Sequence, residues 1–319
     1  MILKLISIYS IIRYVTAILA IAFFTLLERK ILGYRQLRKG PNKVSFIGLL
    51  QPFADAIKLF TKEVVLLRKS NLVTFLLAPI GRLFFNLVLW RLFPFFNQPS
   101  FLIFNILIFI CVSRIRVYFI IIAGWTSNSK YALLGRIRRL AQIISYEVRI
   151  IFIIVSLCIL AKSFSFVDFS KTKAMFRLIL LPIFIPWIIS ILAETSRAPF
   201  DLPEGEAELV SGFNVEYRAG LFAFIFIAEY SNVLIFRVVT CLFFFSPLNL
   251  VVFSLIIASR TLWIRATLPI IRYDQLIYMA WKCFLPLSIA FLLFTIIFLC
   301  LVNLSCKLKN FIIINKIFV

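Results

Sequence analysis

The residues with the clearest potential for chemistry are carboxylates that gather in one stretch of a basic chain. The 319 residues include 35 Lys and Arg but only 13 Asp and Glu, giving a formal net charge of +22. Carboxylates two positions apart repel one another when ionised, so their titrations couple and some protons are retained. The stretch could therefore form a proton path, bind a cation, or dock a basic partner. Six of the 13 acids belong to it: Glu194, Asp201, Glu204, Glu206, Glu208 and Glu216.

Two further acids lie inside apolar runs. Glu147 occurs in "AQIISYEVRIIFIIV" and Glu229 in "AFIFIAEYSNVLIF". Carboxylates within membrane segments are costly and usually functional. Removal from water favours the neutral form of a carboxyl group, so such residues can hold protons that exposed acids release. The alternative is a structural ion pair with an in-span cation such as Arg149 or Arg237.

Metal chemistry has little support in the sequence. The chain contains no His, which excludes a His-ligated haem or a His-bound metal. Its six Cys lie in or beside apolar runs and form no CxxC pair. Small apolar Cys side chains in a membrane interior explain that pattern, so we expect no metal, iron–sulfur cluster or disulfide framework.

The elements that must position the acids are membrane helices. Hydrophobic residues make up 63% of the chain and the mean hydropathy is +1.05. Most apolar runs approach the ~20 residues that cross a bilayer as a helix, and they lack the alternation of a barrel strand. We therefore predict an all-α integral membrane protein, a single multi-span domain over 1–319 with about eight transmembrane helices. The runs cover 5–27, 72–90, 101–124, 141–160, 178–193, 219–245, 247–258 and 284–304.

Charge asymmetry predicts the orientation of these spans. Lys and Arg concentrate in alternate loops, with 20 on one side of the membrane and nine on the other. The positive-inside rule then places both termini on the positive side. The loops expected to face the negative compartment are 29–70, 125–140, 194–218 and 260–283.

Two loops contain features of their own. Within the long loop 28–71, a helical apolar stripe predicts an amphipathic helix over 46–63, which should lie along the membrane interface or pack on the spans. In the acidic loop 194–218, Pro199, Pro203 and Gly205 argue against a continuous helix. The stripe consists of Phe46, Leu49, Leu50, Phe53, Ile57 and Phe60.

Four stretches carry a family resemblance. "AETSRAPFDLPEGEAELVSGFNVEYRAGLFAFIFIAEY" resembles the loop between the fifth and sixth spans of the chain 1 family of respiratory complex I, NADH:ubiquinone oxidoreductase. "LLERKILGYRQLRKGPNKVSFIGLLQPFADAIKLFTKE", "GWTSNSKYALLG…AQIISYEV" and "RYDQLIYMAWKCFLPL" are similar to further parts of that family. The resemblance is ordered along most of the chain and implies eight spans.

The resemblance implies a role in quinone chemistry. It suggests a core membrane subunit of a proton-pumping oxidoreductase that lines the ubiquinone access tunnel, with 194–218 at the quinone site. The tunnel residues it implies are Arg29, Phe53, Asp55, Arg197, Phe222 and Phe226, although core packing would also explain the two last aromatics. The proton path it implies comprises Glu147, Glu194, Asp201, Glu204, Glu206, Glu208, Glu216 and Glu229.

The resemblance also implies partners and a location. Ubiquinone would be the substrate, and this chain would bind no cofactor, since flavin and iron–sulfur clusters belong to partner subunits. Those partners would be the hydrophilic-arm quinone-site subunits, the antiporter-like membrane subunits and membrane lipid, without nucleic acid. The location would be the mitochondrial inner membrane, where the chain is multi-pass. A stand-alone proton or cation transporter and a purely structural anchor are the rival interpretations.

Several arginines depart from the family pattern. Arg82, Arg114, Arg116, Arg149 and Arg237 lie in apolar runs, and only Arg149 has an acid within four residues, Glu147. A charge at mid-bilayer costs at least ~2.5–3.5 kcal/mol. One hypothesis is that the organellar code reads some of these codons, and those of Arg136 and Arg139, as Ser. The alternative is genuine Arg that faces partners or lipid headgroups.

Overall fold

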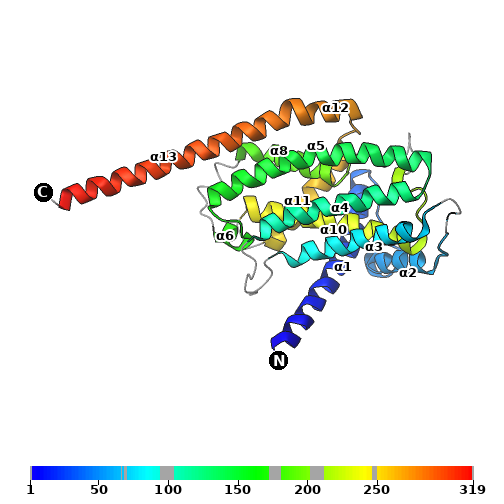
Figure 1. Ribbon diagram of the computed structural model, residues 1–319. Coiled ribbons are helices and arrows are strands. Elements are labelled where there is room, and N and C mark those ends of the chain that lie inside the picture. Colours follow the sequence, from blue (N-terminus) through cyan, green and yellow to red (C-terminus); the bar gives the residue numbers. More distant parts are fainter. Residues whose placement is uncertain are drawn as a thin grey trace.

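Long apolar helices make up most of the computed structural model (Figure 1), and no strand occurs in the part of the chain that it describes. The described residues are 2–65, 67, 70–93, 104–171, 181–201, 212–245 and 250–317. The helices are α1 (Ile2–Arg35), η1 (Phe46–Gly48), α2 (Gln51–Thr61), α3 (Leu72–Arg91), α4 (Asn105–Thr126), α5 (Lys130–Ala161), α6 (Phe166–Lys171), α8 (Leu181–Glu194), η2 (Gly212–Asn214), α10 (Ala219–Phe244), α11 (Leu250–Thr267), α12 (Tyr273–Tyr278), the π-helical η4 (Met279–Phe284) and α13 (Leu285–Ile317).

The predicted all-α, multi-span architecture is confirmed. Within the described ranges, 7 helices are long and apolar enough to cross a membrane. The remaining predicted span corresponds to α8, which has 14 described residues and follows the undescribed segment 172–180. In lipid the backbone must satisfy its own hydrogen bonds, which explains why these apolar runs are helical.

Several helices extend beyond the apolar runs. The predicted loop 125–140 is wrong, because α4 continues to Thr126 and α5 already begins at Lys130. Similarly, α1 reaches Arg35 and α11 reaches Thr267. The charged residues at 136 and 139 are buried on a helix face, so their presence in the sequence did not mark a solvated loop.

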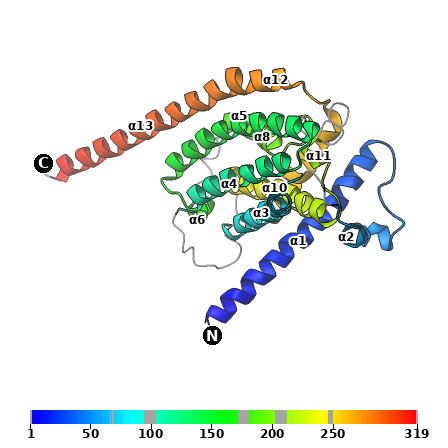
Figure 2. The same ribbon diagram turned by 45° about the vertical axis from the view of Figure 1, so that its right-hand side comes forward.

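Helix α10 is the centre of the bundle. It packs against α1, α2, α3 and α11, while α5 packs against α4, α8 and α13. Figures 1 and 2 show that the C-terminal part of α13 and the N-terminal part of α1 project beyond this packed centre. The centre is therefore where side chains from several spans meet.

A glycine allows α3 and α4 to approach closely. A Cβ atom at Gly81 would lie 2.2 Å from the Phe119 ring of α4. The missing side chain leaves room for that ring, so the two helices can pack tightly. Arg82, directly after this glycine, is thereby placed at the interface of α3 with α10 and is only 5% exposed.

The surface helix α2 is shorter than the predicted 46–63 helix. Ile47 and Gly48 have φ of 58° and 77°, which breaks the helical stripe before α2 begins at Gln51. A Cβ at Gly48 would lie 2.1 Å from the Pro41 carbonyl oxygen, so this turn requires glycine. The exposed fractions of the stripe run from 38% at Phe53 to 77% at Phe46, and α2 thus presents an apolar surface beside α1.

Irregular backbone follows α8, as the prolines predicted. The described residues 195–201 form turns rather than a helix, and 202–211 lie outside the described residues. The Gln142 side chain of α5 donates to the carbonyl oxygens of Ala193 and Phe200, each at 2.8 Å. These two bonds hold both ends of the turn against α5.

Candidate functional site

Glu229 of α10 lies between two arginines from different helices. Its Oε1 accepts hydrogen bonds from Arg82 Nη2 of α3 at 3.2 Å and from Arg139 Nη1 of α5 at 2.9 Å. All three side chains are at most 10% exposed. Buried charges must be paired and hydrogen-bonded to be tolerated, and this carboxylate satisfies that condition by joining three spans.

Two more glutamates pair with α4. Glu147 Oε1 of α5 forms an ion pair with Arg114 Nε at 2.6 Å, and Glu194 at the end of α8 accepts a hydrogen bond from Arg116 Nη2 at 3.1 Å. Arg116 also donates to Asn86 Oδ1 of α3 at 3.1 Å and to the side-chain oxygen of Asn232 of α10. The ion pairs thus connect α4 with α5 and α8, and the two further hydrogen bonds connect it with α3 and α10.

The expected ion-pair partners, Arg149 and Arg237, are not the ones found. Arg149 is two residues from Glu147, and side chains so spaced do not face each other on a helix. Its guanidinium instead lies over the Tyr146 ring at 3.7 Å. Arg237 donates to Thr261 Oγ1 at 2.9 Å and lies over the Phe24 ring at 4.2 Å.

Genuine arginines were expected to face partners or lipid headgroups, and that expectation is also wrong for most of the in-span set. Arg82, Arg116, Arg149 and Arg237 are 5%, 3%, 1% and 4% exposed. Only the Arg114 side chain, at 38%, is substantially accessible. The acids that pair with Arg82, Arg114 and Arg116 come from other helices, so a search for acids nearby in the sequence could not find them.

Asp201 lies in the irregular segment after α8. Burial raises the pKa of Asp201, while the charges of Arg197 and Arg265 oppose that shift. One carboxylate oxygen of Asp201 has no hydrogen-bond partner among the described residues. Arg197 lies over the Tyr230 ring at 4.2 Å. The turn therefore holds a partly compensated carboxyl group that interacts with Glu229, in the middle of α10.

Sequence reasoning missed one buried pair, Glu28 with Arg265. Glu28 of α1 is 4% exposed, and its Oε1 accepts a hydrogen bond from Arg265 Nη1 of α11. Glu28 directly precedes Arg29 in the quoted "ERK". The signal that could have found it is an acid near the end of one apolar span together with cations, Arg260 and Arg265, near the end of another.

The charged residues form a continuous electrostatic chain through the bundle. The charges of Glu147 and Glu194 act on each other, and Arg139 acts on both Glu194 and Glu229. Glu229 in turn interacts with Asp201. The predicted acids Glu147, Glu194, Asp201 and Glu229 are therefore brought together, and a change in the charge of one is felt by the next.

The other predicted acids are not placed in this chain. Glu216 lies in the turn after η2 (Gly212–Asn214), is partly buried, and forms no ion pair within the described residues. Beside it, burial raises the pKa of Tyr217 to about 12. Glu204, Glu206 and Glu208 fall outside the described residues.

Aromatic rings run along the α1 side of α10. Phe222 and Phe226 stack with centroids 6.0 Å apart, and Phe226 lies 4.5 Å from Tyr230. Tyr230 lies 5.8 Å from Phe24 of α1. The two predicted tunnel aromatics are only partly buried, and their row leads to the ring that Arg197 covers.

The remaining predicted tunnel residues meet at the α1–α2 contact. Phe53 of α2 lies edge-on to Phe23 of α1, with centroids 6.0 Å apart. Arg29 Nη1 donates to Asp55 Oδ2 at 2.6 Å, and Gln51 Nε2 donates to Asp55 Oδ1 at 2.9 Å. These bonds fix the surface helix to the end of α1, one residue from buried Glu28.

Metal ligands do not cluster in the described part of the chain. No group of three or more His, Cys, Asp or Glu side chains placed to hold an ion is found among the described residues.

Apolar spans around an internal chain of charges define a multi-span helical membrane protein with a buried polar axis. A match to the family described as NADH dehydrogenase covers residues 8–296. NADH-ubiquinone oxidoreductase chain 1 of Aedes aegypti is 45% identical over 293 residues, 90% of this chain and 94% of that protein. The chain 1 proteins of Branchiostoma lanceolatum and Sarcophilus harrisii are 48% and 47% identical, over 92% and 88% of this chain and 95% and 92% of their own lengths. The chain belongs to the NADH dehydrogenase family.

Proposed function

We propose that this chain, a core membrane subunit of an NADH:ubiquinone oxidoreductase, lines the ubiquinone path and couples quinone reduction to proton translocation. Family membership and the named relatives support the subunit assignment. The observation that carries the coupling proposal is the electrostatic chain from Glu147 through Glu194 and Glu229 to Asp201.

Quinone reduction takes up two protons, so it changes the charge beside any residue that supplies one. Asp201 is suited to respond first, because burial raises its pKa and it lies in a turn rather than within a span. Its charge acts on Glu229, which Arg82 and Arg139 hold between three helices. A local change in charge would then shift paired side chains across the bundle.

The aromatic row supports a path for the quinone itself. Phe53 lies at the α1–α2 contact, and on α10 Phe226 packs against the cluster that includes Phe24 of α1, with Phe222 stacked on it. Aromatic and aliphatic walls suit an apolar quinone tail, while Arg29, Asp55 and Arg197 offer polar groups for the head. In this proposal loop 28–71 frames the entrance, and 194–218 lies at the quinone site.

The proposal implies particular surroundings. The chain would work in the mitochondrial inner membrane beside the hydrophilic-arm quinone-site subunits and the antiporter-like membrane subunits. Flavin and iron–sulfur clusters in those partners would supply electrons, and this chain would contribute no redox centre. Ubiquinone and membrane lipid would be its small-molecule contacts.

Neutralising Glu194 within the assembled complex tests the coupling. Glu194→Gln should lower proton translocation per quinone reduced by at least about tenfold, because it removes the charge that links Glu147 to the rest of the chain. Asp274→Asn is the matched control, since the Asp274 side chain is 74% exposed and, within the described residues, pairs only with the nearby Arg272. Normal pumping in an assembled Glu194→Gln complex would refute the coupling role.

Glu204 and Glu206, which lie outside the described residues, provide a second test. If 194–218 belongs to the proton path, the double variant Glu204→Gln with Glu206→Gln should also uncouple electron flow from the membrane gradient. A photoreactive quinone analogue should in addition label peptides that contain Phe53 or Phe222. If the analogue labels other peptides and the double variant still couples electron flow to the gradient, this chain acts only as a structural anchor.

The rival function is a stand-alone proton or cation transporter that uses Glu147 and Glu229. It predicts ion flux through the isolated chain in liposomes, whereas the proposed subunit should co-purify with flavin and iron–sulfur proteins. Both glutamates are ion-paired with arginines, which favours charge relay over direct cation binding because a cation would have to displace a guanidinium.

A further inference from the structure

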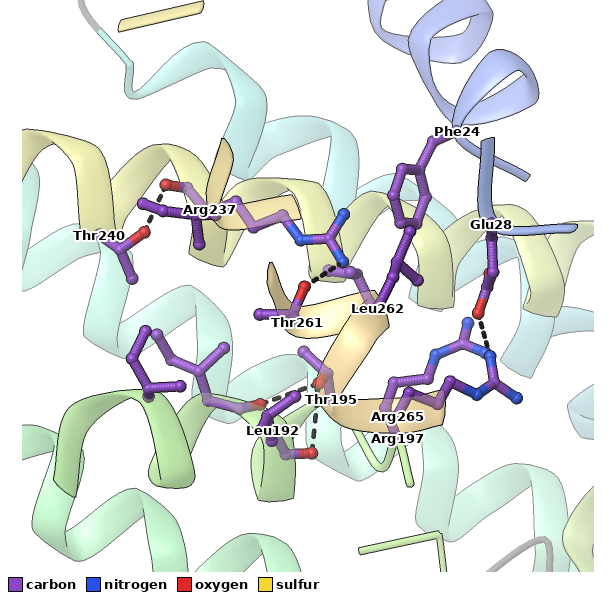
Figure 3. Close-up of a pocket in the computed structure, with 14 residues that line it drawn as sticks. Phe24, Glu28, Leu192, Thr195, Arg197, Arg237, Thr240, Thr261, Leu262 and Arg265 are labelled. Atoms are coloured by element: carbon purple, nitrogen blue, oxygen red, sulfur yellow. Dashed lines mark hydrogen bonds and ion pairs between the residues drawn. The ribbon is translucent and has the colours of Figure 1, made fainter. Parts of the chain in front are cut away.

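A small cavity is lined by residues of α1, α8, α10 and α11. Figure 3 shows its wall, in which Glu28, Arg197, Arg237 and Arg265 approach from different elements. Its volume is about 20 Å³. A cavity needs roughly 10–15 Å³ to hold one water-sized particle, so this one has room for a single small ligand. Much of the remaining wall is apolar, including Ile191 and Leu262.

The charge around the cavity is unbalanced. Arg265 is matched by Glu28, with which it forms an ion pair. Arg237 is 4% exposed and forms no ion pair with any described residue. The negative charge of Glu28 and the positive charge of Arg197 both act on it, with opposite effects. Arg237 therefore places one excess positive charge on the cavity wall, and a buried charge of this kind requires a counter-charge.

One hydrogen-bond donor of Arg237 remains unused. Its Nη2 donates to Thr261 Oγ1 at 2.9 Å. Its Nη1 is buried without a hydrogen-bond partner among the described residues. In Figure 3 the guanidinium extends from α10 between Thr261 and Phe24. The guanidinium also lies over the Phe24 ring at 4.2 Å. This contact holds the group in place, but the ring accepts no conventional hydrogen bond from it.

We infer that this cavity binds one small monovalent anion of the size of a halide, with Arg237 as its principal ligand. The anion accepts a hydrogen bond from Arg237 Nη1 and balances the excess charge. The Phe24 ring and the apolar wall exclude larger, strongly hydrated anions. This site goes beyond the proposed quinone and proton chemistry, since it needs neither a redox reaction nor a transferred proton.

Bromide is a suitable probe for a halide-sized site, because it has a distinct anomalous X-ray signal. The intact complex, prepared with bromide as its only halide, should show an anomalous peak beside Arg237 in this cavity. Arg237→Lys keeps the positive charge and should retain the peak, whereas Arg237→Gln should lower its occupancy at least tenfold. Arg260→Gln is the matched control, because Arg260 is exposed on α11 and its loss should leave the peak unchanged.

Two outcomes would overturn the inference. Density in the cavity of the parent complex without an anomalous bromide signal would identify a bound water instead. A peptide mass that shows Ser at position 237 would remove the principal ligand altogether. Neither outcome bears on quinone labelling or pumping, so failure of this site and failure of the proposed function are distinguishable.

Discussion

Two ion-paired regions of the molecule use the same residue types at very different depths. On the surface, Arg29 and Asp55 join α1 to α2 with side chains that are 51% and 37% exposed. In the interior, Arg116 and Glu194 join α4 to α8 with side chains that are 4% and 3% exposed. Exposed pairs contribute about 0–1 kcal/mol, whereas breaking a buried pair costs about 3–5 kcal/mol. Depth therefore decides how strongly each pair constrains the fold.

Determining by peptide mass whether the in-span cations are Arg is the test with the largest consequence for the comparison of surface and interior pairs. If the organellar code reads these codons as Ser, peptide masses will show Ser at 114, 116 and 149. The interior would then lose cations that pair with Glu147 and Glu194, and these acids would be free to exchange protons. Peptides with Arg masses at all three positions reject the hypothesis and leave the network as described.

Removing one partner of a buried pair should have the largest effect on stability. Arg116→Met leaves the Glu194 carboxylate buried without its main cation, so we expect a loss of about 3–5 kcal/mol. Thermal inactivation and subunit dissociation of the complex would measure it. The double variant with Glu194→Gln should recover most of the loss, because no charge then remains unpaired. A single variant as stable as the parent would contradict the role of burial.

Removing the charge of Arg149 should increase stability rather than lower it. It is 1% exposed, forms no ion pair among the described residues, and lies over the Tyr146 ring at 3.7 Å. Burial of an ion costs several kcal/mol after relaxation, against about 2 kcal/mol for a desolvated cation–π contact. Arg149→Met should thus stabilise the complex by roughly 1–3 kcal/mol. Destabilisation of similar size would reveal a counter-charge that has been missed.

The contribution of Asp201 to folding stability should depend on pH. Because burial raises its pKa, the folded protein binds this proton more tightly than the unfolded chain. Below the pKa of the unfolded chain, the Asp201 carboxyl group is neutral in both the folded and the unfolded state. As pH rises through the higher pKa of the folded state, the folded protein loses stability. Asp201→Asn should therefore be more stable at neutral pH, by about 1.4 kcal/mol for each pKa unit. The difference from the parent should disappear in acid, and a difference independent of pH would exclude titration as its cause.

The surface pair should show the smallest effect. Arg29→Ala is expected to cost less than about 1 kcal/mol, because both partners are solvated. The loss should shrink further at high salt, since screening weakens exposed pairs. A salt series of melting temperatures, compared with Arg116→Met in the same buffers, would measure it. A loss equal to that of the buried variant would end the distinction between the two regions.

Composition and family resemblance predicted the helical multi-span class, the buried acids Glu147, Glu194 and Glu229, and the turn after α8. They could not predict which cation pairs with which acid. Arg82 and Glu229 are 147 residues apart, and Arg116 and Glu194 are 78 residues apart. Sequence proximity instead suggested Arg149 for Glu147, where helix geometry turns the two side chains away from each other.

The sequence alone determined that the backbone would be helical, because long apolar runs in lipid must satisfy their own hydrogen bonds. It also determined that charges would be buried, since Glu147 and Glu229 lie within those runs. Only the tertiary structure decided the partners, the match of Glu28 with Arg265 and the unused donor of Arg237. The physical reason is that helix packing sets the rotation of each span, and rotation decides which side chains meet.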